Sequence, residues 1–228
     1  MLLLGEVFPN FTAKTTEGEI DFFEWLGDSW GILFSHPSDF TPVCTTELAK
    51  LVQLMPEFEK RNVKVIALSC DTVASHFAWA KDVQFIADFG KQHKFPYPII
   101  EDKTRVIAYR LGMIDKDELD SSGIPVTARA VFIVDPKKKY RLSLMYPATT
   151  GRNFIEILRV VDSLQLSDRE PVATPADWKV RRLIFWPRAG FPTWVESPES
   201  KAGKRSKLSY RNGKKIFYNI ILIFEIKR

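Results

Sequence analysis

Hydrophobic and polar positions follow two periods in turn along the chain, which predicts alternating strands and helices. Short continuous apolar runs, typical of buried strands, occupy residues 30–35, 63–70, 97–100 and 128–134, and residues 140–146 form a partner strand across a turn. Apolar side chains recur at helical spacing over residues 42–61, 72–90, 104–111 and 152–165. In the helix over 72–90 we expect Phe77, Ala80 and Ala87 on the buried face. The alternation predicts an α/β fold, a central mixed sheet with helices on both faces.

Charge and periodicity both change near residue 179. Residues 1–178 carry 20 basic and 25 acidic side chains, whereas residues 179–228 carry 13 basic and 3 acidic ones, so the net charge of +5 is the sum of a −5 body and a +10 tail. The body gives no electrostatic reason to expect nucleic acid as a partner. The tail shows no sustained period, and we expect it to be poorly ordered.

The two cysteines, Cys44 and Cys70, limit the chemistry available to the chain. They exclude a disulfide framework and a four-cysteine zinc site, and we expect neither a metal nor a prosthetic cofactor. Lone thiols fit a reducing compartment, here the cytoplasm. The apolar runs at residues 1–4 and 220–224 are too short for a signal peptide or a transmembrane segment.

Cys44 lies where a helix is expected to begin. Thr41 followed by Pro42 is a helix start signal, with Thr41 as the N-cap that can accept the Cys44 amide. The Cys44 sulfur would then lie at the positive end of the helix dipole, which favours the reactive thiolate. A lone cysteine is more often a small buried apolar residue, but polar neighbours such as Glu47 favour a functional thiol here. Cys70 ends an apolar strand, and we interpret it as structural.

The spacing Pro37-x-x-x-Thr41-x-x-Cys44 resembles the peroxiredoxin active-site motif, and residues 42–47 are similar to the one-cysteine, peroxiredoxin 6 type. The resemblance covers residues 2–179, including runs at 27–37, 125–129 and 146–154. It implies a thioredoxin-like fold. The implied domains are a thioredoxin-like peroxidase domain at 1–166, the start of the family's C-terminal domain at 167–179, and a basic non-family tail at 180–228.

The resemblance also implies the reaction and the residues that perform it. The chain would reduce hydrogen peroxide and organic hydroperoxides, with phospholipid hydroperoxides among the candidates, by oxidising Cys44 to a sulfenic acid. Arg129 would place a positive charge beside the sulfur, Thr41 would orient the peroxide, and Pro37 would shield the thiol from water. Taken alone, Arg129 could equally be an ordinary ion pair at a strand end.

Three further residues are expected to support this set. Glu47 and Arg152 would orient Arg129, and His36 would pack or form a hydrogen bond. Because no cysteine follows Cys70, the resemblance implies reduction by an external thiol, typically glutathione delivered by a glutathione S-transferase. It also implies a homodimer.

A second activity is suggested by Gly27-x-Ser29-x-Gly31, which fits the hydrolase nucleophile pattern. Some relatives are described as calcium-independent phospholipases A2 that use this serine. Here the serine precedes a strand instead of following one, and Phe23 and Lys137 stand where the family has its histidine and acid. A bifunctional lipid hydrolase therefore remains an alternative, as does a non-enzymatic homologue with a weakened site.

The tail has two interpretations of its own. Val180-Arg181 directly after Lys179 is what a retained intron would encode, so the tail could be an error in the gene model. A genuine tail could tether the protein to nucleic acid or to an anionic membrane.

Overall fold

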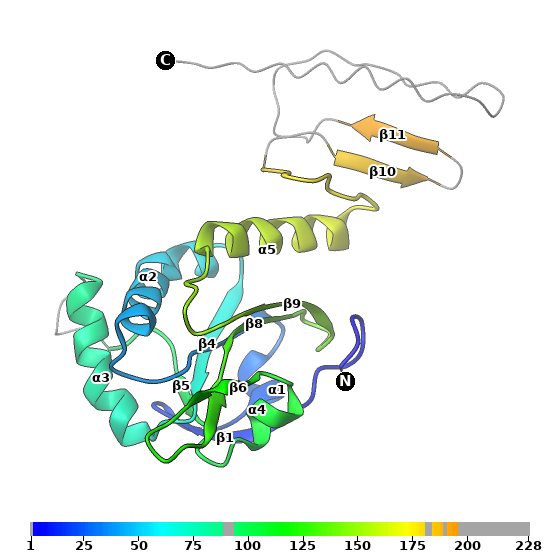
Figure 1. Ribbon diagram of the computed structural model, residues 1–228. Helices are drawn as coiled ribbons and strands as arrows, with labels where there is room; N and C mark the ends of the chain where they lie inside the picture. Colours follow the sequence, from blue (N-terminus) through cyan, green and yellow to red (C-terminus); the bar gives the residue numbers. More distant parts are fainter. Residues whose placement is uncertain (1, 89–93, 181–183, 189–190, 196–228) are drawn as a thin grey trace. The chain divides into compact units, whose positions relative to one another are not determined.

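A seven-stranded mixed sheet forms the centre of the fold (Figure 1). The computed structural model describes residues 2–88, 94–180, 184–188 and 191–195. The strands are β1 Thr12–Thr15, β2 Gly18–Asp21, β3 Trp30–Ser35, β4 Val63–Ser69, β5 Ile99–Glu101, β8 Arg129–Val134 and β9 Tyr140–Tyr146. Their order is β2-β1-β5-β4-β3-β8-β9, in which β3, β4 and β5 run parallel and the other pairs are antiparallel.

Helices cover both faces of this sheet. They are α1 Phe22–Leu26, α2 Pro42–Glu59, α3 Val73–Ile86, α4 Val106–Arg110 and α5 Phe154–Arg169. Neighbouring residues of a strand point to opposite faces, so Leu33 of β3 packs in one cluster with side chains of α1 and α4. Phe34 lies on the other face, with its ring centroid 6.4 Å from that of Phe58 in α2 and 5.8 Å from that of Phe154 in α5. The predicted α/β, thioredoxin-like fold is confirmed.

The predicted elements are all present, with small shifts at their ends. β3 and β9 have the predicted bounds, α2 ends two residues earlier than predicted, and α5 runs four residues further. The elements that the pattern missed are β1, β2, α1 and a hairpin of β6 Ile114–Leu119 with β7 Pro125–Thr127. Most of their residues are polar or half-exposed, so they show no clear apolar period.

The buried face of α3 differs from the prediction. Ala80 and Ala87 are buried, but the Phe77 side chain is 53% exposed. His76 and Trp79 fill the interior instead, each fully buried. Apolar residues surround most of this helix, so apolar spacing alone does not determine which face turns inward, and a buried polar side chain is not anticipated by it.

Part of the C-terminal segment contains regular structure. Strands β10 Ile184–Arg188 and β11 Phe191–Val195 form an antiparallel pair, although the sequence shows no sustained period there. Aromatic and β-branched side chains are frequent in both segments and favour strands. The rest of the predicted tail, apart from Val180, lies outside the described residues. The chain divides into two units, Met1–Val161 and Asp162–Arg228, so the division lies inside α5, five residues before the predicted one.

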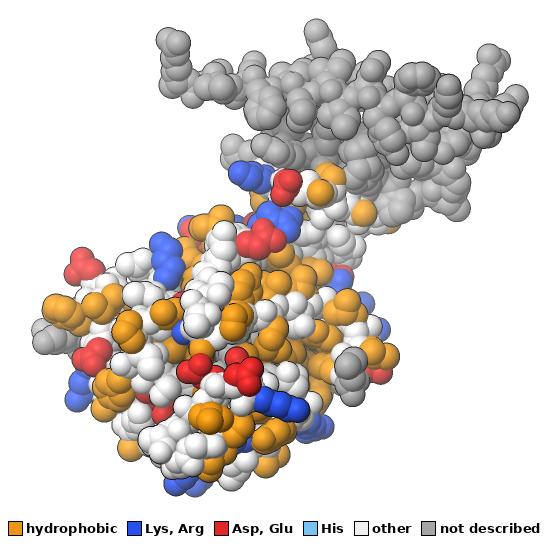
Figure 2. Space-filling model, viewed as in Figure 1, with side chains coloured by type: hydrophobic (Ala, Val, Ile, Leu, Met, Phe, Trp, Pro, Cys, Tyr) orange, Lys and Arg blue, Asp and Glu red, His pale blue; other side chains and the backbone are white. Residues whose placement is uncertain are grey.

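Charged side chains of both signs are scattered among hydrophobic ones on the face of the larger unit shown in Figure 2. Among the described residues, no helix combines the length and the apolar character needed to cross a membrane.

Candidate active site

The loop that joins β3 to α2 places Cys44 in the interior. β3 ends at Ser35, and α2 begins at Pro42 after an extended Thr41 with φ −94° and ψ 146°. Cys44 is the third residue of α2, as predicted, and its side chain is fully buried. The helix dipole therefore directs its positive end toward the region of the sulfur.

Thr41 does not cap the helix as expected. Its hydroxyl makes no capping bond with α2 and donates instead to the Ser38 carbonyl oxygen at 3.0 Å. The tight turn over residues 38–41 brings this carbonyl within reach of the hydroxyl, which satisfies the hydroxyl inside the loop. The Thr41 carbonyl oxygen accepts two hydrogen bonds, from the Thr45 amide at 2.9 Å and from the Thr45 hydroxyl at 2.7 Å.

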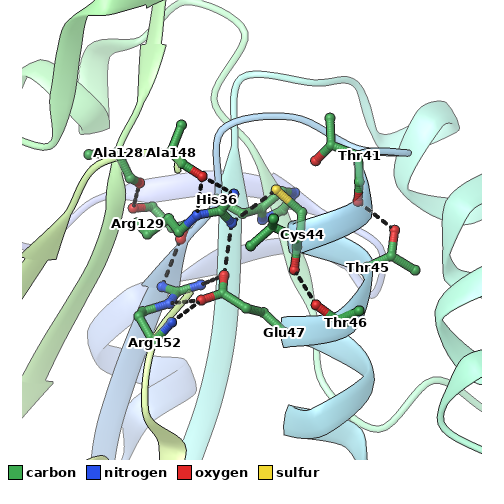
Figure 3. A network of polar contacts seen from close by, with 12 residues as sticks. His36, Thr41, Cys44, Thr45, Thr46, Glu47, Ala128, Arg129, Ala148 and Arg152 are labelled. Atoms are coloured by element: carbon green, nitrogen blue, oxygen red, sulfur yellow. Dashed lines mark hydrogen bonds and ion pairs between the residues drawn. The ribbon is translucent and has the colours of Figure 1, made fainter. Parts of the chain in front are cut away.

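Arg129, the first residue of β8, lies beside the sulfur (Figure 3). Its Nη1 donates to Cys44 Sγ at 3.2 Å and to Glu47 Oε2 at 2.9 Å. Its Nε and Nη2 donate to the Ala148 carbonyl oxygen at 2.9 and 2.6 Å, which fixes the plane of the guanidinium. The structure therefore places the predicted positive charge in contact with the predicted nucleophile.

Glu47 joins the two arginines. Its Oε1 accepts the Arg152 amide at 2.6 Å and Arg152 Nε at 3.0 Å, and its Oε2 accepts Arg152 Nη2 at 2.8 Å as well as Arg129. Arg152 Nη1 also donates to the carbonyl oxygens of Ser35 and Ala130 at 2.8 and 2.7 Å. Burial disfavours the ionised carboxyl, but the charge and hydrogen bonds of Arg152, together with Arg129, outweigh it and hold the pKa of Glu47 below its usual value.

The charges of this network do not cancel. Arg129, Arg152 and Glu47 are all buried, and together they carry two positive charges and one negative charge. A buried charge is costly unless it is paired. The Cys44 sulfur, which accepts a hydrogen bond from Arg129, lies next to this excess positive charge.

His36 and Pro37 lie at the start of the same loop, and both are buried. His36 Nε2 is 2.8 Å from Asp39 Oδ1, and its ring centroid is 5.0 Å from that of Trp79. Burial holds the pKa of His36 below its usual value, although Asp39 opposes that shift. The structure thus places His36 in the packing and hydrogen-bonding position that the sequence predicts, and Pro37 inside the loop.

One group of side chains has the chemistry of metal ligands. His36, Asp39 and His76 each offer a ligand atom, and these atoms lie within 4.8 Å of one another. One nitrogen of each histidine, Nε2 of His36 and Nδ1 of His76, already pairs with a carboxylate oxygen of Asp39 at 2.8 Å. Their hydrogen bonds with one another account for the arrangement, which therefore does not require an ion.

Two participants were not anticipated from the sequence. The Ala148 carbonyl oxygen is a backbone atom, and no side-chain pattern marks it. Asp39 lies in the loop between β3 and α2. The one feature of the sequence that could have indicated its role is its place two positions before Thr41. Its 5% exposure, which makes its hydrogen bonds important, became visible only in the folded chain.

The environment of Ser29 does not favour the lipid hydrolase alternative. Ser29 precedes β3, and its hydroxyl donates to Asn62 Oδ1 at 3.0 Å. An amide oxygen cannot act as the general base that a serine nucleophile needs. Lys137, at the position of the family's acid, is exposed.

The second thiol has the environment of a structural cysteine. Cys70 follows β4 and is partly buried. Burial raises the pKa of the Cys70 thiol to about 11, although the Arg105 charge opposes the shift. The thiolate, which is the reactive form, is therefore scarce at this position near neutral pH.

Comparisons with known proteins agree with this geometry. Residues 4–143 match the AhpC/TSA family. Peroxiredoxin-6 of Rattus norvegicus is 64% identical over 212 residues, which cover 90% of this chain and 95% of that protein. Peroxiredoxin-6 of Homo sapiens is 61% identical over 178 residues, which cover 78% of this chain and 80% of that protein.

Solved structures show the same relationship. A cysteine-to-serine mutant of the peroxiredoxin 6 of Arenicola marina is 56% identical, with a TM-score of 0.80 over 83% of this chain and 85% of that one. The yeast mitochondrial 1-Cys peroxiredoxin, described with its thiol resolving mechanism through glutathione/thioredoxin systems, is 47% identical, with a TM-score of 0.75 over 82% and 87% of the two chains. The chain belongs to the AhpC/TSA family and, within it, to the one-cysteine peroxiredoxins of the peroxiredoxin 6 type, which are thiol peroxidases.

Proposed function

We propose that Cys44 is the peroxidatic cysteine of this peroxidase, with Arg129, Thr41 and Pro37 as its partners. The observation that supports this most directly is the 3.2 Å contact between Arg129 Nη1 and Cys44 Sγ. Arg129 stabilises the thiolate, and Glu47 and Arg152 hold Arg129 in place. The buried hydrogen bonds that join Glu47 to Arg129 and Arg152 argue against a weakened, non-enzymatic homologue.

In the reaction, the Cys44 thiolate attacks the terminal oxygen of a hydroperoxide. An S–O bond forms, the O–O bond breaks, and the leaving oxygen takes a proton and departs as water or an alcohol. The Thr41 hydroxyl gives its own hydrogen to Ser38, so its oxygen remains an acceptor for the O–H of the peroxide. Arg129 donates to the oxygen on which negative charge develops as the O–O bond breaks. Cys44 becomes a sulfenic acid.

The sulfenic acid requires a thiol from another molecule. Cys70 is a poor candidate, because its raised pKa leaves little thiolate. We propose glutathione as the reductant, delivered by a glutathione S-transferase: one thiol displaces water to give a mixed disulfide, and a second releases Cys44 and forms a disulfide with the first. The glutathione and thioredoxin systems described for the yeast mitochondrial relative support this class of reductant.

We also propose that the protein is a cytoplasmic homodimer. Both cysteines are free, which suits a reducing compartment. β9 is at one edge of the sheet, and among the described strands it pairs only with β8. An edge strand of this kind can pair with the same strand of a second copy.

One mass measurement tests the central role of Cys44. After one equivalent of hydrogen peroxide without added thiol, the peptide that contains Cys44 should gain one oxygen, and then a second with further peroxide. Cys44→Ser should abolish peroxide consumption in the presence of glutathione, whereas Cys70→Ser, the matched control, should retain it. Equal loss of activity in both variants would contradict the assignment.

A further inference from the structure

The peptide group between Ser38 and Asp39 is hydrogen bonded at both ends. Its carbonyl oxygen, on Ser38, accepts the Thr41 hydroxyl at 3.0 Å, and its N–H, on Asp39, donates to Asp71 Oδ2 at 2.9 Å. A peptide group is planar and rigid. The carboxylate of Asp71 therefore fixes the direction of the Ser38 carbonyl and, through it, the direction of the Thr41 hydroxyl hydrogen.

The side chain of Asp39 ties the same loop to α3. Its Oδ2 accepts Ser75 Oγ and pairs with His76 Nδ1, each at 2.8 Å, and its Oδ1 pairs with His36 Nε2 at 2.8 Å. The other nitrogen of His76 is 3.2 Å from the Ile100 carbonyl oxygen, so both sides of this fully buried ring are fixed. Burial disfavours ionised Asp39, but the two histidines outweigh that effect and hold its pKa far below the usual range.

Phe40, between Asp39 and Thr41, has a strained backbone. Its φ is +57°, a left-handed conformation that is unusual for a bulky side chain, and that side chain is 56% exposed. A conformation of this kind persists only when the surrounding contacts fix it. The anchored Asp39 on one side and the hydroxyl bond of Thr41 on the other supply such contacts.

We propose that Asp71 and His76 are positioning residues for peroxide reduction. They hold the loop over residues 38–41 so that the Thr41 hydroxyl hydrogen stays on Ser38 and its oxygen remains free to accept the O–H of a hydroperoxide. The proposal rests on the role of Thr41 given above. Neither residue acts on the sulfur itself, whose charge is balanced by Arg129.

Arg129 and the loop over residues 38–41 have separate roles, so two reactions of the same sulfur need different parts of the site. Oxidation by hydrogen peroxide needs both the thiolate and the acceptor oxygen of Thr41. Alkylation by iodoacetamide needs the thiolate, but this reagent has no peroxide O–H to orient. Loss of the positioning residues should therefore slow oxidation and spare alkylation.

The experiment compares Asp71→Ala and His76→Phe with Asp82→Ala, which removes an exposed carboxylate from α3. Oxidation of Cys44 is followed by tryptophan fluorescence in stopped flow, and its alkylation by the mass of the Cys44 peptide. We expect Asp71→Ala and His76→Phe to slow oxidation by about ten- to a hundredfold and to change alkylation by less than about threefold. Asp82→Ala should change neither rate.

Two milder variants distinguish a loss of these hydrogen bonds from general damage to the fold. Asp71→Asn keeps an oxygen that can accept the Asp39 N–H, so oxidation should return to within about threefold of the unsubstituted protein. Ser75→Ala removes one of the hydrogen bonds to Asp39 and should give an intermediate rate.

Parallel loss of oxidation and alkylation in these variants would overturn the proposal, because it would show damage to the thiolate. Unchanged oxidation in Asp71→Ala would overturn it too. If the unsubstituted protein were not oxidised at Cys44 at all, the proposed function would fail instead, so the two failures can be told apart.

Discussion

At the scale of single residues, Cys44 and Cys70 show how environment separates two chemically identical side chains. Cys44 accepts a hydrogen bond from a guanidinium and is in the first turn of a helix. Cys70 lies at the end of a strand, and burial raises its pKa to about 11. Cys44 is the more buried of the two, so their environments differ in the guanidinium contact and not in a greater exposure of Cys44.

Thr41 provides a prediction at this scale. Thr41→Val keeps the volume of the side chain but removes the acceptor oxygen, so the rate of Cys44 oxidation by hydrogen peroxide should fall by about a hundredfold. Thr41→Ser keeps the hydroxyl and should stay within about fivefold of the unsubstituted protein. Stopped-flow fluorescence measures both, and equal rates for the two variants would show that the hydroxyl has no part in the reaction.

At the scale of elements, the site is assembled where several segments meet. The first two turns of α2 supply Cys44 and Glu47, β8 supplies Arg129, and the segment before α5 supplies the Ala148 carbonyl oxygen and Arg152. Each of these segments is held by the core beneath it. The geometry of the site thus depends on how α2 and α5 pack on one face of the sheet.

Phe34 of β3 tests that dependence. Its ring packs against Phe58 of α2 and Phe154 of α5, and the Arg152 guanidinium lies over it, 5.3 Å from its centroid. Phe34→Ala should lower the free energy of unfolding by about 3 to 5 kcal/mol, because a cavity would replace a buried ring.

Denaturant unfolding measures this loss. Phe77→Ala, which truncates a phenylalanine that is 53% exposed, is the matched control and should change the free energy of unfolding much less. A similar loss in both variants would contradict the burial pattern described for β3 and α3.

At the scale of the whole molecule, buried carboxylates connect stability to pH. The pKa of Glu47 lies below its usual value of about 4.5. Its ionised form therefore stabilises the fold above the unfolded value, and this contribution is lost as the pH falls through the lower, folded value.

The free energy of unfolding should accordingly decrease as the pH is lowered from about 5 toward 3. Urea titrations across that range would measure it. Glu47→Gln should be less stable at neutral pH, because it leaves two buried arginines without their carboxylate, and should lose part of the pH dependence. An unchanged pH dependence in this variant would show that Glu47 does not carry the effect.

The proposed dimer is also a property of the whole molecule. Met145 on β9 is 48% exposed, and Met145→Lys would place a charge on this edge. We expect this variant to be a monomer by light scattering, and the unsubstituted protein to have twice that mass. A monomeric unsubstituted protein would rule the dimer out.

Local sequence determined a large part of this protein. The apolar runs of β3, β4 and β8 and the helical spacing of α2 are visible in the chain, because a buried face imposes its period on the sequence. The Thr-Pro start of α2 located Cys44 in the first turn. The elements that the apolar pattern did not predict, such as β1, β2 and β6, are short and partly exposed, and so show little apolar periodicity.

The tertiary structure alone decided how the site is held together. Glu47 meets Arg129 and Arg152 across 82 and 105 positions of sequence, and Asp39 meets His76 across 37. Such pairs leave no local pattern, because each partner lies on a different element with its own period. The direction of the Thr41 hydroxyl was likewise fixed only by the folded loop, where the Ser38 carbonyl replaced the helix cap that the sequence had indicated.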